Sequence, residues 1–260
     1  MSRAKTKSNN SYKLFEPKYP MEIKNEINLK KGAATFLDVL GWKGIWIENR
    51  QAINILHSLV QETIKKAKSI TFEYMENDKL RGNDNLRGRD NFGGIDTNVL
   101  SISDTIALFT SGPAEIAIEI HAKICSWLLE YAFKQKIPLR GAISYGEYSI
   151  KENIMLGYAV DEAASWHEKT DWIGVILTPS AKFAVGTNKL QSITTYDQIP
   201  FKSSIKNLNL CVDWSYQDKA DLFKIIQSKG PHTPEIAPKY LNTLSYFNYR
   251  ENEQLKKINH

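Results

Sequence analysis

The amino-acid sequence predicts an α+β fold with the split βαβ order of ferredoxin-like domains, followed by a further α-β unit and a helical C-terminal extension. Short β-branched apolar runs, which are typical of strands, alternate with longer segments of helical periodicity in the order β-α-β-β-α-β. The second and third of these runs adjoin, as the two strands of a hairpin do. After Trp214 the chain becomes polar and helical in character, with prolines that separate two helices.

The composition excludes several classes of protein. A chain of 260 residues suits one well-packed domain with additions, and 42% apolar with 24% charged residues excludes a wholly disordered chain. No apolar run reaches the length of about 18 residues that a membrane-spanning helix needs. Cys125 and Cys211 form neither a disulfide framework nor a zinc motif, and residues 1–13 lack the apolar stretch of a secretory signal. We therefore expect a reduced, cytoplasmic protein without a membrane partner.

The net charge of +5 is unevenly distributed along the chain. Much of the excess of Lys and Arg lies within the first 31 residues, and the remainder is close to balanced. Residues 1–28 are therefore expected to be a basic, flexible lead-in, which is either a solvated tail or an arm that binds a polyanion. We favour the solvated tail, so nucleic acid is not the expected partner.

The expected core domain covers residues 29–215 and begins with a buried strand and a helix. Residues 35–41 form a short apolar run that ends in a glycine, which favours a strand, and residues 48–68 carry a helical apolar face. Residues 69–75 fit either a strand or the end of that helix. Residues 76–98 are rich in Asn, Asp and Gly, which predicts a long polar loop inserted into the domain.

The rest of the core is expected to begin with a hairpin, whose strands cover residues 98–103 and 105–110 with Asp104 at the tip. Pro113 suits the first position of the next helix, which extends to Lys134. The remaining core elements are a strand at 139–148, a helix at 160–168 and a strand at 173–178. Residues 216–260 form the helical extension.

Two acidic residues stand in otherwise apolar segments, where the packing of a strand or hairpin does not require a carboxylate. Asp38 lies inside the first strand and Asp104 lies at the hairpin tip, so a β-α-β-β arrangement brings both to one edge of the sheet. Two neighbouring carboxylates repel each other unless a cation neutralises them. Mg²⁺ and Mn²⁺ prefer such oxygen ligands and bind substrate phosphates at their remaining positions. Either acid considered alone is best interpreted as the cap of a turn. The presence of both favours a metal site.

A glycine-flanked turn follows Asp38 directly. The residues Gly41, Trp42, Lys43 and Gly44 lead toward a helix, and exposed backbone N–H groups in such a turn suit phosphate. Lys43 adds a positive charge. Because single glycine turns are common, this feature supports a phosphate site only together with the two acids.

Four motifs then resemble those of class III nucleotidyl cyclases, in that family's order over about residues 33–180. FLDVLGW at 36–42 is similar to the F-x-D-I-x-G signature, and VLSISDTIALF at 99–109 to the second metal-Asp hairpin. LRGAISYG at 139–146 resembles the R-x-G-I-x-x-G strand, and LGYAVDEAA at 156–164 the start of the G-x-x-V-N-x-A helix. The order and spacing of the set carry the resemblance, since each motif alone is modest.

The resemblance implies a site and a reaction. Asp38 and Asp104, with the carbonyl of Val39, would hold two Mn²⁺ or Mg²⁺ ions, and the backbone at 40–43 would contact the triphosphate. The ribose 3′-oxygen would attack the α-phosphate and expel pyrophosphate. The resemblance also implies a homodimer, because class III sites form between two antiparallel domains. The substrate-binding residues expected from the first motif are Phe36, Leu40, Gly41, Trp42 and Lys43, with Trp46 beyond it.

The positions that read the base depart from the purine cyclases. Leu100 and Ile154 stand where those enzymes have a Lys and an Asp, and neither side chain can hydrogen-bond a base. Trp42 and Trp46, if they border the pocket, would narrow it toward a pyrimidine. This pattern resembles the pyrimidine cyclases of Pycsar antiphage systems, which make cyclic UMP or cyclic CMP and activate a separate effector. We expect UTP to be favoured over CTP.

The residues at the positions that stabilise the transition state also differ from those of the family. The family's Asn and Arg fall at Asp161 and Ser165, which cannot supply positive charge. Either Arg140, Lys43 or a residue of the 81–89 loop substitutes, or the chain is a degenerate cyclase. Because both metal acids are present, we favour an active enzyme. Two alternatives remain open: a purine cyclase, and a non-catalytic nucleotide sensor.

Overall fold

The computed structural model describes residues 28–42, 50–80, 95–216, 219–228 and 233–258. Its centre is a sheet in which β1 (Lys30–Val39) lies between β3 (Thr105–Ser111) and β4 (Leu139–Lys151), antiparallel to both. β2 (Thr97–Ile102) pairs with β3 at the edge, so the strand order is β2-β3-β1-β4. Together with the order of elements along the chain, this confirms the predicted α+β fold with a split βαβ core.

The sheet continues beyond β4. β6 (Gly174–Leu177) pairs with β4 in parallel, which is the further α-β unit that the sequence predicts. β8 (Leu210–Val212) and β7 (Ile193–Thr195) extend the sheet, and β5 (Ile154–Leu156) folds back on the end of β4 as a hairpin. A short helix, α5 (Pro179–Val185), follows β6.

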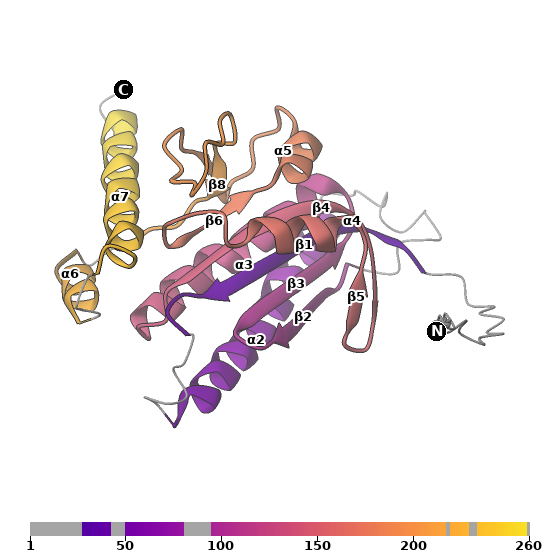
Figure 1. The fold of residues 1–260 in the computed structure, drawn as a ribbon. Helices are drawn as coiled ribbons and strands as arrows, with labels where there is room; N and C mark the ends of the chain where they lie inside the picture. The colour runs from indigo at the N-terminus through magenta and orange to yellow at the C-terminus, as the bar shows by residue number, and fades with distance from the viewer. Residues whose placement is uncertain (1–27, 43–49, 81–94, 217–218, 229–232, 259–260) are drawn as a thin grey trace, which may run out of the picture.

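Helices cover both faces of the sheet (Figure 1). α2 (Ala52–Leu80) and α3 (Ala114–Lys134) pack on one face, where the alternate strand residues Leu37 and Val39 point into the main core. α4 (Tyr158–Trp166) packs on the other face through Ala159, Val160 and Ala163. The odd and even residues of β1 therefore contact different layers, and Asp38 shares the α4 face with Phe36.

A chain of buried hydrogen bonds joins the helices to the sheet. Nδ1 of His121 lies 2.6 Å from the hydroxyl of Thr35, and its Nε2 lies 2.9 Å from that of Thr110. The Thr110 hydroxyl contacts that of Thr97 at 2.8 Å, and Thr97 contacts Thr71 of α2 at 2.8 Å. Burial lowers the pKa of His121 to about 3, so the ring is neutral and serves as a structural link.

The C-terminal segment packs into the same core as the sheet. α6 (Lys219–Gln227) and α7 (Ala237–Ile258) lie at one end of the molecule in Figure 1. Tyr246 of α7 is fully buried, and its hydroxyl donates a hydrogen bond to the carbonyl of Val212 at 3.2 Å. The two helices expected after Trp214 are thus present, and α7 is joined to β8.

Several boundaries differ from those predicted. α2 extends to Leu80, so residues 76–80 are helical where a loop was expected, and residues 69–75 belong to this helix. β4 continues to Lys151 and forms a hairpin with β5, which the sequence did not predict. The lead-in at 1–27 and the segment 81–94 lie outside the described residues. In the part of the chain that the structure describes, no helix has the length and apolar character to cross a membrane.

Candidate active site

Asp38 occupies the end of β1, at the centre of the sheet. Its neighbours across the two ladders are Thr105 of β3 and Arg140 of β4. Only 8% of the Asp38 residue is exposed. A carboxylate at this depth needs a compensating cation, and Arg140 is the one that the fold provides.

Arg140 makes two hydrogen bonds to one oxygen of Asp38. Its Nε lies 3.1 Å and its Nη2 3.0 Å from Oδ2, while its Nη1 donates to the carbonyl of Thr170 at 3.2 Å. Burial nevertheless raises the pKa of Asp38, and the charge of Arg140 opposes that rise only in part. Oδ1 of Asp38 accepts no hydrogen bond from the residues that the structure describes.

Asp104 lies at the tip of the β2–β3 hairpin, as predicted. Ser103 adopts a φ of 56°, which makes the tight turn, and the carbonyl of Asp104 accepts a hydrogen bond from the N–H of Val39 at 3.3 Å. This bond ties the hairpin tip to the end of β1. The negative charge of Asp104 contributes to the raised pKa of Asp38, although less than burial does. The fold therefore brings the two predicted acids together where β1 ends and β3 begins, as expected.

Both acids border one cavity of about 710 Å³. Arg140 and the stretch from Val39 to Trp42 also line it, so seven of the predicted site residues meet there. The further lining residues are Ala52, Ile53, Leu56, Ser103, Thr105, Glu168 and Lys239. The volume falls in the range of small-molecule sites, which runs from roughly 300 to 1,000 Å³.

The predicted phosphate turn begins at this cavity. The N–H of Leu40 is bonded to the carbonyl of Pro138 at 2.8 Å, which fixes the end of β1. Gly41 then turns the chain with a φ of 73°, a conformation that favours glycine. Trp42 is half-buried at the cavity wall. Lys43 and Trp46 lie outside the described residues.

Four predicted substrate-binding residues do not line this cavity. Phe36 is buried against Phe109 in the layer under α4. Leu100 packs at the edge of that layer, and Ile154 of β5 is 67% exposed. Asp161 is exposed in the first turn of α4. The cavity thus brings together the residues predicted for metal and phosphate, whereas those predicted to contact the base, as far as the structure describes them, lie outside it.

Sequence reasoning missed Lys239 and Glu168 at the cavity wall. Glu168 follows α4 and lies 3.7 Å from Nη2 of Arg140. Lys239 lies in the first turn of α7, far along the chain from β1. Nothing in its local sequence distinguishes it from other helical lysines, because only the docking of α7 brings it to the site.

The carboxylates fit divalent metal ions bound together with a polyphosphate. The described residues contain no cluster of three or more His, Cys, Asp or Glu that could hold a metal alone. Mg²⁺ commonly binds through one or two carboxylates and completes its coordination with phosphates and water. Asp38 and Asp104 offer that donor set, and Arg140 bonds only Oδ2 of the Asp38 carboxylate.

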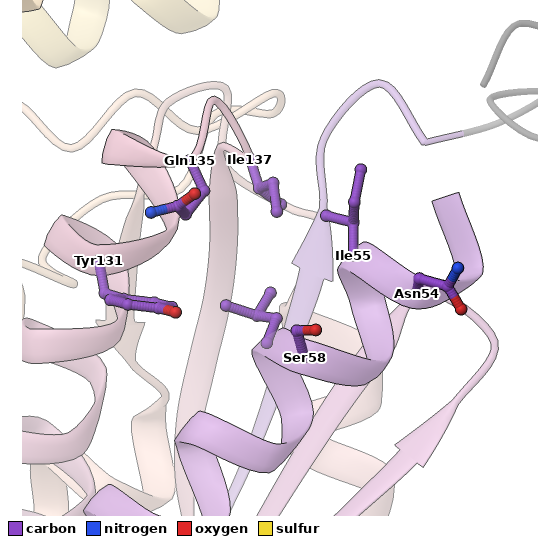
Figure 2. A pocket seen from close by; sticks show the side chains of 7 residues that line it. Asn54, Ile55, Ser58, Tyr131, Gln135 and Ile137 are labelled. Carbon is purple, nitrogen blue, oxygen red and sulfur yellow. The ribbon is translucent and has the colours of Figure 1, made fainter. Parts of the chain in front are cut away.

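A second, smaller cavity of about 300 Å³ lies between α2 and α3. Figure 2 shows Tyr131 reaching from α3 toward Ser58 of α2. Its lining is neutral and consists of Asn54, Ile55, Ser58, Leu59, Tyr131, Gln135 and Ile137. A site without charged side chains does not suit a triphosphate, so the cavity at Asp38 is the candidate active site.

No model of a known protein family matches the sequence, and no curated protein matches it. Solved structures of nucleotidyl cyclases are similar to the chain. The adenylyl cyclase CyaB from P. aeruginosa has a TM-score of 0.47 and 15% identity over 75% of this chain and 99% of that chain. The guanylate cyclase domain of RhGC from Catenaria anguillulae, in complex with GTP, has a TM-score of 0.47 and 15% identity, covering 71% and 97%. The adenylate cyclases from Trypanosoma brucei have a TM-score of 0.43 and 10% identity over 72% of this chain and 91% of that chain.

Proposed function

We propose that the chain is a nucleotide cyclase that converts a pyrimidine nucleoside triphosphate, UTP in preference to CTP, into the 3′,5′-cyclic nucleotide and pyrophosphate. The observation that carries this proposal is the meeting of Asp38, Asp104 and Arg140 at the wall of one cavity, beside the Gly41 turn. Two acids at one cavity wall, one of them oriented by Arg140, suit divalent ions bound together with a polyphosphate. The four sequence motifs point to the same reaction.

The proposed chemistry divides the work among the site residues. Asp38 and Asp104 would hold two Mn²⁺ or Mg²⁺ ions, with the Val39 carbonyl as a further ligand. Such ions lower the pKa of a hydroxyl and stabilise the charge of a leaving pyrophosphate. Arg140 fixes the carboxylate of Asp38 through two hydrogen bonds. The Gly41 turn positions the phosphates, so that the ribose 3′-oxygen and the α-phosphorus are held in one geometry.

The proposed preference for a pyrimidine rests on the absence of hydrogen-bonding side chains at the two positions that read a purine base. The side chains of Leu100 and Ile154 offer no hydrogen bond to a purine edge, and the bulky Trp42 lines the cavity. Both apolar residues lie outside this cavity, which fits a homodimer in which each copy supplies the base positions of the other's site. Sedimentation equilibrium should then give the mass of two 29.7 kDa chains.

The direct experiment supplies purified protein with equimolar ATP, GTP, CTP and UTP and Mn²⁺, and identifies the products by mass spectrometry. Cyclic UMP as the main product, with less cyclic CMP, supports the proposal. Cyclic AMP or cyclic GMP alone would retain the cyclase reaction and overturn the pyrimidine assignment.

A catalytically degenerate nucleotide sensor is the second candidate. The geometry of Arg140 favours it, because the guanidinium is bound to Asp38 and to the Thr170 carbonyl rather than free to reach a substrate. Asp161 and Ser165 of α4 supply no positive charge either. A sensor would bind a triphosphate and release no cyclic product, which calorimetry and the product assay together distinguish.

We further propose a cytoplasmic role as a second-messenger synthase in antiphage defence, acting through a separate effector that the cyclic nucleotide activates. This role rests on the resemblance of the V-D-E-A-A helix and the base positions to Pycsar cyclases. Phage plating on cells that carry the gene and its neighbours tests it. Asp104→Ala should abolish protection, whereas protection by the variant would favour the sensor.

A further inference from the structure

The C-terminal helix α7 brings a cation into the cavity of Asp38 and Asp104. Lys239 lines that cavity, and its side chain is 22% exposed. Its Nζ lies 3.3 Å from Oδ1 of Asp171 and donates to the carbonyl of Glu235. These contacts hold the ammonium group near the cavity and leave it in partial contact with solvent.

The backbone of α7 is fixed where Lys239 lies. The side chain of Asn242 donates to the carbonyl of Asp171 at 2.8 Å, and the N–H of Ile173 donates to the hydroxyl of Thr243 at 2.9 Å. Both bonds join the first turns of α7 to the segment that leads into β6. Lys239 is therefore delivered to the cavity by packing, and only its flexible stem is free to move.

Lys239 and Arg140 are the two cations among the described residues that line this cavity. Arg140 is bonded to Asp38, whereas Lys239 has one half-buried carboxylate partner and one carbonyl. Lys202 lies near the same groups: burial is the largest cause of its lowered pKa, the charges of Arg140 and Lys239 also lower it, and those of Asp171 and Glu168 oppose them. Lys239 is thus the cation that α7 contributes to the lining of this cavity, with the carboxylates of Asp171 and Glu168 close by.

We propose that Lys239 binds the terminal phosphates of the substrate, so that α7 supplies part of the active site. The identity of the substrate as a nucleoside triphosphate rests on the function proposed above. A compact ammonium group is suited to a phosphate oxygen, and Asp171 holds it in place until a phosphate replaces that carboxylate. Lys239 is thus a substrate-binding residue at the polyphosphate end, separate from the residues that hold the metal ions.

The test compares Lys239→Met with Lys239→Arg and with Lys256→Met, which alters an exposed lysine near the end of the same helix. Calorimetry with inorganic tripolyphosphate and Mg²⁺ measures binding without turnover. Loss of a charge-assisted hydrogen bond predicts that Lys239→Met weakens this binding by about 10- to 100-fold. Lys239→Arg keeps the charge and most of the affinity, and Lys256→Met leaves it unchanged.

Asp171→Asn separates phosphate binding from a structural role of the ion pair. It removes the partner of Lys239 and keeps the lysine, so the affinity for tripolyphosphate should stay the same or rise. The inference is overturned if Asp171→Asn weakens binding as much as Lys239→Met, if Lys239→Met binds normally, or if the wild-type protein binds no tripolyphosphate. Thermal unfolding confirms that each variant is folded.

Steady-state kinetics with UTP distinguish this inference from the proposed function. A higher KM with a smaller change in kcat is expected for Lys239→Met. An unchanged KM would overturn the role of Lys239 and leave the cyclase proposal intact. If the protein binds tripolyphosphate through Lys239 but makes no cyclic nucleotide, the role of Lys239 stands and the cyclase proposal is overturned.

Discussion

Asp38 and Arg140 face each other across the adjacent strands β1 and β4, and the guanidinium donates two hydrogen bonds to the same carboxylate oxygen, at 3.0 and 3.1 Å. The pair is buried, with 12% of the aspartate and 8% of the arginine side chain exposed. Arg140 thereby orients the carboxylate that faces the cavity. The arginine of the third motif and the aspartate of the first thus form one structural unit.

Arg140→Met should destabilise the protein strongly, because it leaves Asp38 buried without its cation. Breaking a buried pair in this way costs about 3–5 kcal/mol. Urea unfolding followed by circular dichroism measures the change in the free energy of unfolding. Arg50→Met, at an exposed position, is the matched control and should change it little. A loss below about 1 kcal/mol in Arg140→Met would mean that solvent replaces the arginine.

Asp104→Asn should remove the stabilisation that Mn²⁺ gives in the presence of a triphosphate analogue. A ligand at 100 times its dissociation constant stabilises the native state by about 2.7 kcal/mol, which a thermal-shift measurement detects. Glu130→Gln, which alters an exposed acid of α3, should keep the full shift. An equal shift in Asp104→Asn would show that the ion binds elsewhere.

His121 should make stability depend on pH below its ordinary pKa of about 6.5. Its pKa in the folded protein is lowered to about 3 by burial. Between these values the unfolded chain binds a proton that the folded protein does not, so stability falls as pH falls, by up to about 1.4 kcal/mol per pH unit. In the window from pH 6.5 to about 5 most carboxylates do not titrate, and the contribution of His121 is obtained as the difference in slope between variants.

The comparison that checks this effect is His121→Gln against His57→Gln. Glutamine at 121 keeps a donor and an acceptor for Thr35 and Thr110 but does not titrate, so the slope in this window should decrease. His57 is exposed, and its replacement should leave the slope as it is. An identical slope in His121→Gln would assign the pH dependence to other groups.

Gly157→Ala should displace α4 from the sheet. A Cβ at this position would lie 2.5 Å from the carbonyl oxygen of Glu147, and the φ of +127° is itself unfavourable for alanine. Gly186→Ala is the control, because its φ is +59° but its Cβ would meet no atom closer than 4.0 Å. Unfolding measurements should show a larger loss for Gly157→Ala than for the control; equal losses would mean that only backbone strain matters.

Local pattern predicts the centre of this fold well. The apolar runs around Asp38 and Asp104 have the length and residue types of strands, and their order implies the β2-β3-β1-β4 arrangement that the structure has. Residues 76–80 were misassigned because Glu76, Asn77, Asp78 and Lys79 are polar residues typical of loops, whereas the helix continues through them. The hairpin of β4 and β5 was missed because Glu152 and Asn153 form a two-residue turn without a glycine.

The site was predictable only where its residues are close in sequence or adjacent in the sheet. Asp38 and Arg140 belong to neighbouring strands and Asp104 to the turn before β3, so strand order alone brings them together. Lys239 reaches the same cavity because α7 packs against the segment before β6, a contact that no periodicity encodes. The pairing of Arg140 with Asp38 also depends on register, which a one-residue slip would abolish.

The central claim is that Asp38 and Asp104 act together on a pyrimidine triphosphate, and the rate of cyclic UMP formation tests it most directly. Wild-type protein with UTP and Mn²⁺ should form cyclic UMP, and Asp38→Asn and Asp104→Asn should each lower the rate by more than about 100-fold. Glu130→Gln should retain the wild-type rate. Full activity in either Asp variant, or no cyclic nucleotide from the folded wild-type protein with any triphosphate, would contradict the claim.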